Sequence, residues 1–158
     1  MLVLFVLLNS FSFIQCVRIL GFFPTPSYSN QIIFQPIWKQ LSLRGHNVTV
    51  VTPQPLYDPS LTNLTEIDIP FAYDILSKYG WPNEYVKLAS TLHRLDYLLH
   101  AGKELTMNIW EYGPVQHIIN DQHDKFDLLI VQVAYNVNLL LNSLAFKFRT
   151  PIVGKSVN

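Results

Sequence analysis

Short apolar runs alternate with helical patterns along this chain. Residues 17–23 form an almost continuously apolar run that is ended by two nearby prolines, which is typical of a buried strand. Apolar side chains spaced four residues apart then predict a helix over 31–43. Residues 47–52 are rich in β-branched side chains and predict a second strand. The chain therefore opens with a strand–helix–strand unit.

The alternation continues less evenly after residue 52. Leu88, Leu92, Leu95 and Leu99 fall on one helical face, and we expect that face to be buried. A further helix is predicted over 104–120, with a break at Gly113-Pro114; its inward-facing residues are Ile109, Val115, Ile118 and Ile119. The other predicted elements are a loop over 53–65, a strand over 66–69, irregular structure over 70–83, a strand over 126–131, a helix over 139–146 and a strand over 151–154.

This order of elements predicts the α/β fold class. Strands that alternate with helices form a parallel sheet with right-handed crossovers. Nearly continuous apolar strands agree, because parallel strands are covered on both faces. The chain stops four residues after Gly154 with no closing helix. We therefore expect a Rossmann-like parallel sheet with flanking helices that is incomplete.

The first 17 residues contain no charged side chain and include the apolar run 2–8. This predicts a secretory signal peptide over 1–16, cleaved after Cys16, and one domain over 17–158. Polar residues interrupt the run too early for a spanning helix, which needs about 20 apolar residues. An uncleaved anchor or a buried strand is the alternative.

Composition excludes several function classes. Charged residues make up 14% of the 158 residues and apolar ones 49%, which is enough apolar surface to exclude a disordered chain. The formal net charge of zero argues against nucleic acid as a partner. The five histidines lack a convincing metal spacing, so no metal site is expected. Neither a G-x-G-x-x-G fingerprint nor a P-loop is present, which argues against a nucleotide bound within these residues.

The turn after the first strand is the best candidate for a ligand site, because ligands of open α/β sheets bind beyond the carboxyl ends of the strands. Tyr28 and Phe34 offer apolar surface there for a small organic ligand, and the alternative is that such aromatics are core. Asn30 stands where the helix should begin, and chemistry alone favours an N-cap. Asn63, in the sequon N-L-T of a predicted loop, can carry a glycan if the chain enters the lumen.

Three stretches of the sequence resemble the amino-terminal region of UDP-glycosyltransferases, especially those of insects. The longest covers 18–53, which begins R-I-L-G-F-F-P-T-P-S-Y-S-N-Q and ends R-G-H-N-V-T-V-V-T-P. The others are D-P-S-L-T-N-L-T-E-I-D at 58–68 and F-D-L-L-I-V-Q at 126–132. They follow in the expected order, and the signal-like start agrees with the same family.

The resemblance implies a GT-B enzyme with two Rossmann-like halves and an active site between them. The amino-terminal half, which this chain resembles, binds a small lipophilic acceptor. The carboxyl-terminal half binds the UDP-sugar and precedes a membrane anchor, so this chain by itself is expected to hold no cofactor. The implied location is the lumen and membrane of the endoplasmic reticulum, and the fragment alone would be lumenal or secreted.

The resemblance also assigns two catalytic positions. In such enzymes a histidine at the start of the first helix takes the proton of the acceptor hydroxyl, and an acidic residue at the end of the F-D-x-x-x-x strand orients that histidine. Asn30 and Gln132 occupy these positions here. An amide is not a useful proton acceptor near neutral pH, so it is uncertain from the sequence whether the chain belongs to an active enzyme.

Three interpretations stay open. The complete protein transfers a hexose to acceptors that need little help from a base, such as amines or acidic phenols. Alternatively, it is a non-catalytic binder of lipophilic molecules. The third interpretation is an incomplete sequence or a decayed copy.

Overall fold

The computed structural model describes residues 16–81, 83, 87, 90–121, 125–133 and 138–155. The predicted signal peptide, apart from Cys16, lies outside these residues. The elements in chain order are β1 (Arg18–Phe22), α2 (Tyr28–Leu43), β2 (Asn47–Thr52), β3 (Leu64–Asp68), α3 (Phe71–Lys78), α5 (Thr91–Glu111), α6 (Gly113–Asn120), β4 (Leu128–Gln132), α7 (Asn138–Phe148) and β5 (Ile152–Lys155).

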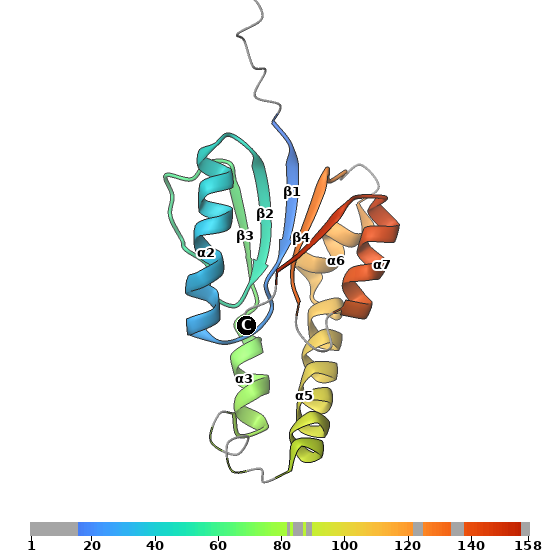
Figure 1. The fold of residues 1–158 in the computed structure, drawn as a ribbon. Helices are drawn as coiled ribbons and strands as arrows, with labels where there is room; N and C mark the ends of the chain where they lie inside the picture. Colours follow the sequence, from blue (N-terminus) through green and yellow to red (C-terminus); the bar gives the residue numbers. More distant parts are fainter. Residues whose placement is uncertain are drawn as a thin grey trace, which may run out of the picture.

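One parallel sheet of five strands organises the fold, in the order β3-β2-β1-β4-β5. Helix α2 covers one face of the sheet, and α6 and α7 cover the other (Figure 1). Strand β1 lies at the centre, and its side chains alternate between the two layers. Leu20 and Phe22 join the core beneath the later helices, whereas Ile19 joins the core beneath α2. The predicted α/β parallel sheet is confirmed.

An aromatic cluster fixes α2 against the sheet. The ring of Phe23 lies 5.0 Å from that of Phe34 and 4.9 Å from that of Trp38, measured between ring centroids. Gly21 makes room for this packing, because a Cβ there would come within 2.9 Å of the Phe23 ring. The three aromatic side chains are fully buried, so the start of α2 is held close to the end of β1.

Two predicted features of the middle of the chain are wrong. The stretch expected to be irregular contains α3, because Pro70 stands at its N-cap position, where the missing N–H costs no hydrogen bond. The predicted leucine face is exposed: Leu92, Leu95 and Leu99 are exposed by 76%, 44% and 46%. Leu88 lies outside the described residues.

The position of α5 explains the exposed leucines. Its first half and α3 extend past the carboxyl ends of the strands, so only the second half of α5 reaches the sheet (Figure 1). The buried side chains of α5 are Ala101, Leu105 and Ile109. The predicted inward positions in the second half and in α6 are confirmed, and the helix is interrupted at Tyr112, next to the predicted break.

A leucine pair on α5 tests this placement. Leu105 is 5% exposed, and Leu105→Ala is expected to lower the free energy of unfolding by about 2–5 kcal/mol, since it leaves a cavity. Leu92→Ala is the matched control on the same helix and is expected to change it by less than about 0.5 kcal/mol. Urea denaturation followed by circular dichroism measures both. Losses of equal size would show that the first half of α5 is packed in solution.

Candidate active site at the carboxyl edge of the sheet

The predicted catalytic positions both lie at the carboxyl edge of the two central strands. Strands β1 and β4 are parallel neighbours, and Phe22 pairs with Val131. Gln132 is the last residue of β4, and α2 begins six residues after β1 ends, at the same edge (Figure 1). The sheet therefore places the first turn of α2 and the end of β4 at one edge, as expected of a ligand site in this fold.

Asn30 is the third residue of α2 and is half-buried, so the expectation that it caps the helix is wrong. Ser27 occupies the N-cap position without a side-chain hydrogen bond to the helix backbone. Its hydroxyl lies 3.1 Å from that of Ser29 instead. The side chain of Asn30 is thus not needed to satisfy the end of the helix.

Gln132 is 3% exposed and contacts the loop between β1 and α2. Its Oε1 accepts a hydrogen bond of 3.3 Å from the backbone N–H of Thr25. Within the described part of the chain, no hydrogen bond joins the side chains of Asn30 and Gln132. The structure brings the two residues to the same edge and links Gln132 to the loop that leads into the helix of Asn30.

Gln31 is the residue that sequence reasoning missed. It is fully buried, and its Nε2 donates to the carbonyl oxygens of Phe23 at 2.9 Å and Thr25 at 2.8 Å. Its Oε1 accepts from the hydroxyl of Thr52 at 2.9 Å, at the end of β2. The sequence signal was its spacing, three and seven residues before the buried Phe34 and Trp38, which places a polar residue on the buried face of α2.

The hydrogen-bond network continues from Thr52 to α3. The Thr52 hydroxyl accepts from the backbone N–H of Gln54 at 3.1 Å. The backbone carbonyl of Gln54 accepts from Gln35 Nε2 at 3.0 Å, and its side-chain Oε1 accepts from the hydroxyl of Tyr73 at 3.2 Å. Burial raises the pKa of Tyr73, so its hydroxyl stays protonated and donates. Polar side chains thus join the ends of β1 and β2 to α2 and α3.

The two predicted acceptor contacts differ in exposure. Tyr28, the first residue of α2, is 64% exposed at this edge and available to a ligand. Phe34 is fully buried in the aromatic cluster, which gives its ring a packing role. An acceptor would reach the Phe34 ring only if this core opened.

The loop after β2 is held by two acidic residues of β3. The carboxylate of Glu66 accepts from the backbone N–H groups of Leu56 and Tyr57, at 2.9 Å and 3.0 Å. The hydroxyl of Tyr57 donates to Asp68 Oδ2 at 2.5 Å, which raises the pKa of Tyr57. Among the described residues, no group of three or more His, Cys, Asp or Glu side chains is arranged to hold a metal ion.

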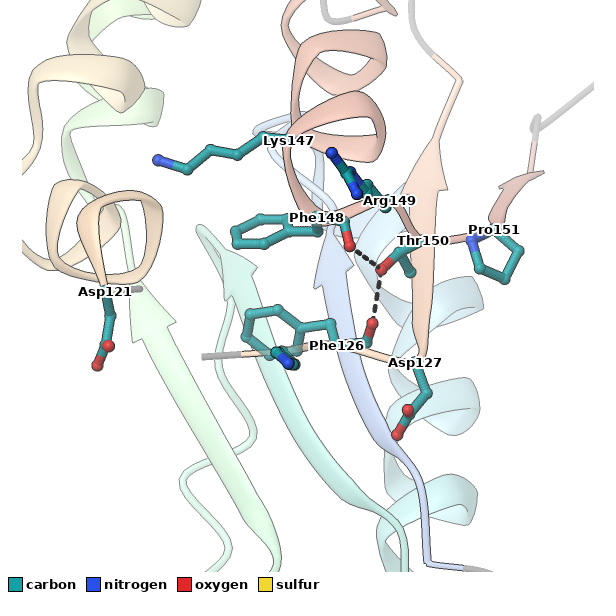
Figure 2. Close-up of a pocket in the computed structure, with 9 residues that line it drawn as sticks. Asp121, Phe126, Asp127, Lys147, Phe148, Arg149, Thr150 and Pro151 are labelled. Carbon is teal, nitrogen blue, oxygen red and sulfur yellow. Dashed lines mark hydrogen bonds between the residues drawn. The ribbon is translucent and has the colours of Figure 1, made fainter. Parts of the chain in front are cut away.

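A pocket of about 560 Å³ lies at the opposite edge, beside the amino end of β4 (Figure 2). Phe126 and Phe148 line it, and the hydroxyl of Thr150 donates to their backbone carbonyls at 2.6 Å and 3.1 Å. Lys147 and Arg149 stand near the end of α7, where positive charge is favourable. This pocket contains neither Asn30 nor Gln132, and it lies at the wrong edge for the predicted chemistry.

The sequence contains a second sequon, N-V-T at Asn47, and the asparagines of both sequons are exposed. Asn63 lies in the turn before β3, as expected, and its carbonyl accepts from the N–H of Val48 at 2.9 Å. Asn47, which the sequence placed at the start of a buried strand, is exposed as well.

In the described part of the chain, no helix has both the length and the apolar character needed to cross a membrane.

Known proteins show where this sequence belongs, although no family model matches it. It is 30% identical over 166 residues to an ecdysteroid UDP-glucosyltransferase of Spodoptera littoralis nuclear polyhedrosis virus, covering 97% of this chain and 31% of that protein. A similar match to an ecdysteroid UDP-glucosyltransferase of Lymantria dispar multicapsid nuclear polyhedrosis virus has 29% identity and covers 82% of this chain and 26% of that protein.

An insect relative agrees with the viral ones. The chain is 28% identical over 163 residues to a UDP-glycosyltransferase of Dactylopius coccus, covering 99% of this chain and 30% of that protein. It therefore spans about a third of the length of the curated relatives that it matches. Together with the parallel sheet, these matches show that the chain belongs to the UDP-glycosyltransferase family.

Proposed function

We propose that this chain is the acceptor-binding part of a UDP-glycosyltransferase that transfers a hexose from a UDP-sugar to a small lipophilic acceptor. The observation that carries the proposal is the placement of Asn30 and Gln132 at one edge of adjoining parallel strands. The family resemblance assigns to them the positions of the base and its acidic partner. The UDP-sugar is a substrate that residues outside this chain would hold.

The chemistry of the site differs from that of a histidine and an acid. In the transfer, the acceptor oxygen bonds to the anomeric carbon, the bond to UDP breaks, and the acceptor hydroxyl loses its proton. Asn30 can hydrogen-bond that hydroxyl but cannot take its proton. General-base catalysis contributes typically about 10²–10⁴-fold to the rate. Acidic phenols and amines are therefore the acceptors that this site favours over alcohols.

The names of the relatives suggest the first acceptors to examine. The two viral relatives described above are named for ecdysteroids, so an ecdysteroid is the alcohol acceptor to compare with acidic phenols and amines. Tyr28 supports such a role, because its exposed ring stands at the start of α2, two residues before Asn30 in the chain. An aromatic ring offers apolar surface and a hydroxyl to a ligand of this type.

A lipophile-binding protein without transfer activity is the second candidate. It is favoured by the presence of amides at both catalytic positions, since amides can bind a hydroxyl but do not exchange protons with it. The two candidates differ in the response to repair of the site. An enzyme gains transfer activity when the base is restored, whereas a binder retains affinity and shows no transfer.

Entry into the endoplasmic reticulum is part of the proposal. The apolar start of the sequence supports a cleaved signal peptide, and the exposed Asn63 supports glycosylation in the lumen. In the complete protein, a carboxyl-terminal anchor outside this chain would attach the enzyme to the membrane.

Repair of the two catalytic positions tests the proposed transfer. In the complete protein, Asn30→His with Gln132→Glu is expected to raise kcat/KM for an alcohol acceptor by about 100-fold or more, because a general base is restored. Either change alone should give less. Acidic phenols should gain least, since they release their proton readily. Release of UDP measures transfer for each acceptor.

The matched control is Gln40→His, which adds a histidine to the exposed side of the same helix, about 15 Å from Asn30. It should leave transfer unchanged. If the repaired protein folds and gains nothing over this control, Asn30 and Gln132 are not the catalytic positions.

Glycosylation tests the proposed entry into the lumen. Expressed from Met1 in insect cells, the chain is expected to carry a glycan on Asn63 that peptide N-glycosidase F removes. Asn63→Gln should abolish the mass shift on gel electrophoresis, and Asn47→Gln should retain it, because Asn63 lies in a turn whereas Asn47, although exposed, lies in the regular backbone of β2. A secreted chain with no glycosidase-sensitive mass would contradict this prediction.

A further inference from the structure

We propose that Gln31 is a positioning residue, whose buried amide holds the first turn of α2, and with it Asn30, in a fixed relation to Gln132. Thr25 links Gln31 to Gln132, because its backbone is hydrogen-bonded to both side chains. This inference rests on the proposed function only for the identity of the two catalytic positions. Gln31 itself contacts backbone and Thr52, and no acceptor contact is assigned to it.

The loop that Gln31 holds has few hydrogen-bonding groups of its own. Residues 24–26 read Pro-Thr-Pro, so the N–H of Thr25 is the only backbone donor among them. Gln132 accepts a hydrogen bond from that donor. Gln31 donates to the carbonyl oxygens of Phe23 and Thr25, on either side of Pro24. Two buried side-chain amides, that of Gln132 from the sheet and that of Gln31 from the helix, therefore form hydrogen bonds to the same loop.

Thr25 is held at both ends of its backbone. Its N–H is bonded to Gln132 and its carbonyl oxygen to Gln31, which also lies next to Asn30 in the chain. A shift of α2 along its axis would break the Gln31 bonds before it changed the fold of the helix. The bond from Thr52 to Gln31 Oε1 orients the amide so that its NH₂ group faces the loop.

The same arrangement suits a carboxylate at position 132. A carboxylate has two oxygens, and one can accept from the N–H of Thr25 while the other is free to orient a base on α2. The loop would then fix the carboxylate as it now fixes the amide. We infer that Gln31 sets the distance over which any pair at these two positions interacts.

An introduced histidine reports this distance. In the 158-residue chain, the pKa of the imidazole in Asn30→His is measured by a pH titration followed by NMR, with and without Gln132→Glu. The carboxylate favours the charged imidazolium and is expected to raise its pKa by about one pH unit. Adding Gln31→Met should remove most of this increase. Gln35→Met, one helical turn later and bonded to Gln54 instead of the loop, should leave it intact.

A milder pair of substitutions, both at Thr52, tests the same role if the Gln31→Met variant does not fold. Thr52→Val keeps the shape of the side chain and removes the hydroxyl bonded to Gln31, so it should reduce the increase in the pKa of the imidazole. Thr52→Ser restores the hydroxyl and should restore the increase. Equal effects of Gln31→Met and Gln35→Met, or of Thr52→Val and Thr52→Ser, would overturn the positioning role.

The titration tests this inference independently of the proposed function, because it does not measure sugar transfer. A raised pKa that depends on Gln31, together with a repaired protein that does not transfer sugar, would support the positioning role and reject the enzyme. A pKa that Gln132→Glu does not raise even with Gln31 present would overturn the positioning role and the assignment of the catalytic pair.

Discussion

The need to satisfy the buried polar groups where β1 turns into α2 constrains this end of the molecule. Two prolines leave residues 24–26 with one backbone donor, the Thr25 N–H, and the carbonyl oxygens of Phe23 and Thr25 on either side of Pro24 accept from the buried Gln31. Leaving a buried polar group unpaired costs about 1–3 kcal/mol, which is more than a typical hydrogen bond contributes. Gln31 and Gln132 meet this need from opposite sides, and the position of α2 follows from it.

The same constraint joins the packing of the sheet to the site. Phe23 follows β1 directly, and its ring is enclosed by Phe34 and Trp38 on α2. Its carbonyl oxygen accepts from Gln31. One residue therefore contributes to the apolar core through its side chain and to the polar network through its backbone. Because both contacts involve α2, the helix cannot move relative to the strand without disturbing both.

The sequence was sufficient to predict the sheet and insufficient for the features beyond it. Strands β1 and β4 were predicted correctly because parallel strands covered on both faces are nearly continuously apolar, and β2 because of its β-branched side chains. Leu92 shows why the rest failed: its spacing indicates a helix with an apolar face, but periodicity contains no information on where that helix ends relative to the sheet. Residues 70–83 were predicted to be irregular because the sequence alone does not show that a helix begins directly after Pro70, which stands at the N-cap of α3.

The site could be predicted in position and not in detail. The family resemblance placed Asn30 at the start of a helix and Gln132 at the end of a strand, and in the structure Asn30 lies in the first turn of α2 and Gln132 ends β4. It could not locate Gln31, because a glutamine in a helix is ordinarily an exposed residue, and its burial follows from carbonyl groups that fold back in the preceding loop. It also could not separate Tyr28 from Phe34, since both are aromatic residues of α2 and only the packing of the helix buries one of them.

The amide at position 30 explains why an amide and not a carboxylate occupies position 132. An acid at position 132 would be almost completely buried, and a buried carboxylate requires a partner of opposite charge or several hydrogen-bond donors. A histidine at position 30 would supply that charge when it takes a proton. Asn30 does not, so among the described residues a carboxylate at 132 would keep the Thr25 N–H as its hydrogen-bond donor and would have no partner of opposite charge. Glutamine keeps the accepting oxygen and removes the charge, so with asparagine at position 30 the neutral amide is the more stable occupant of position 132.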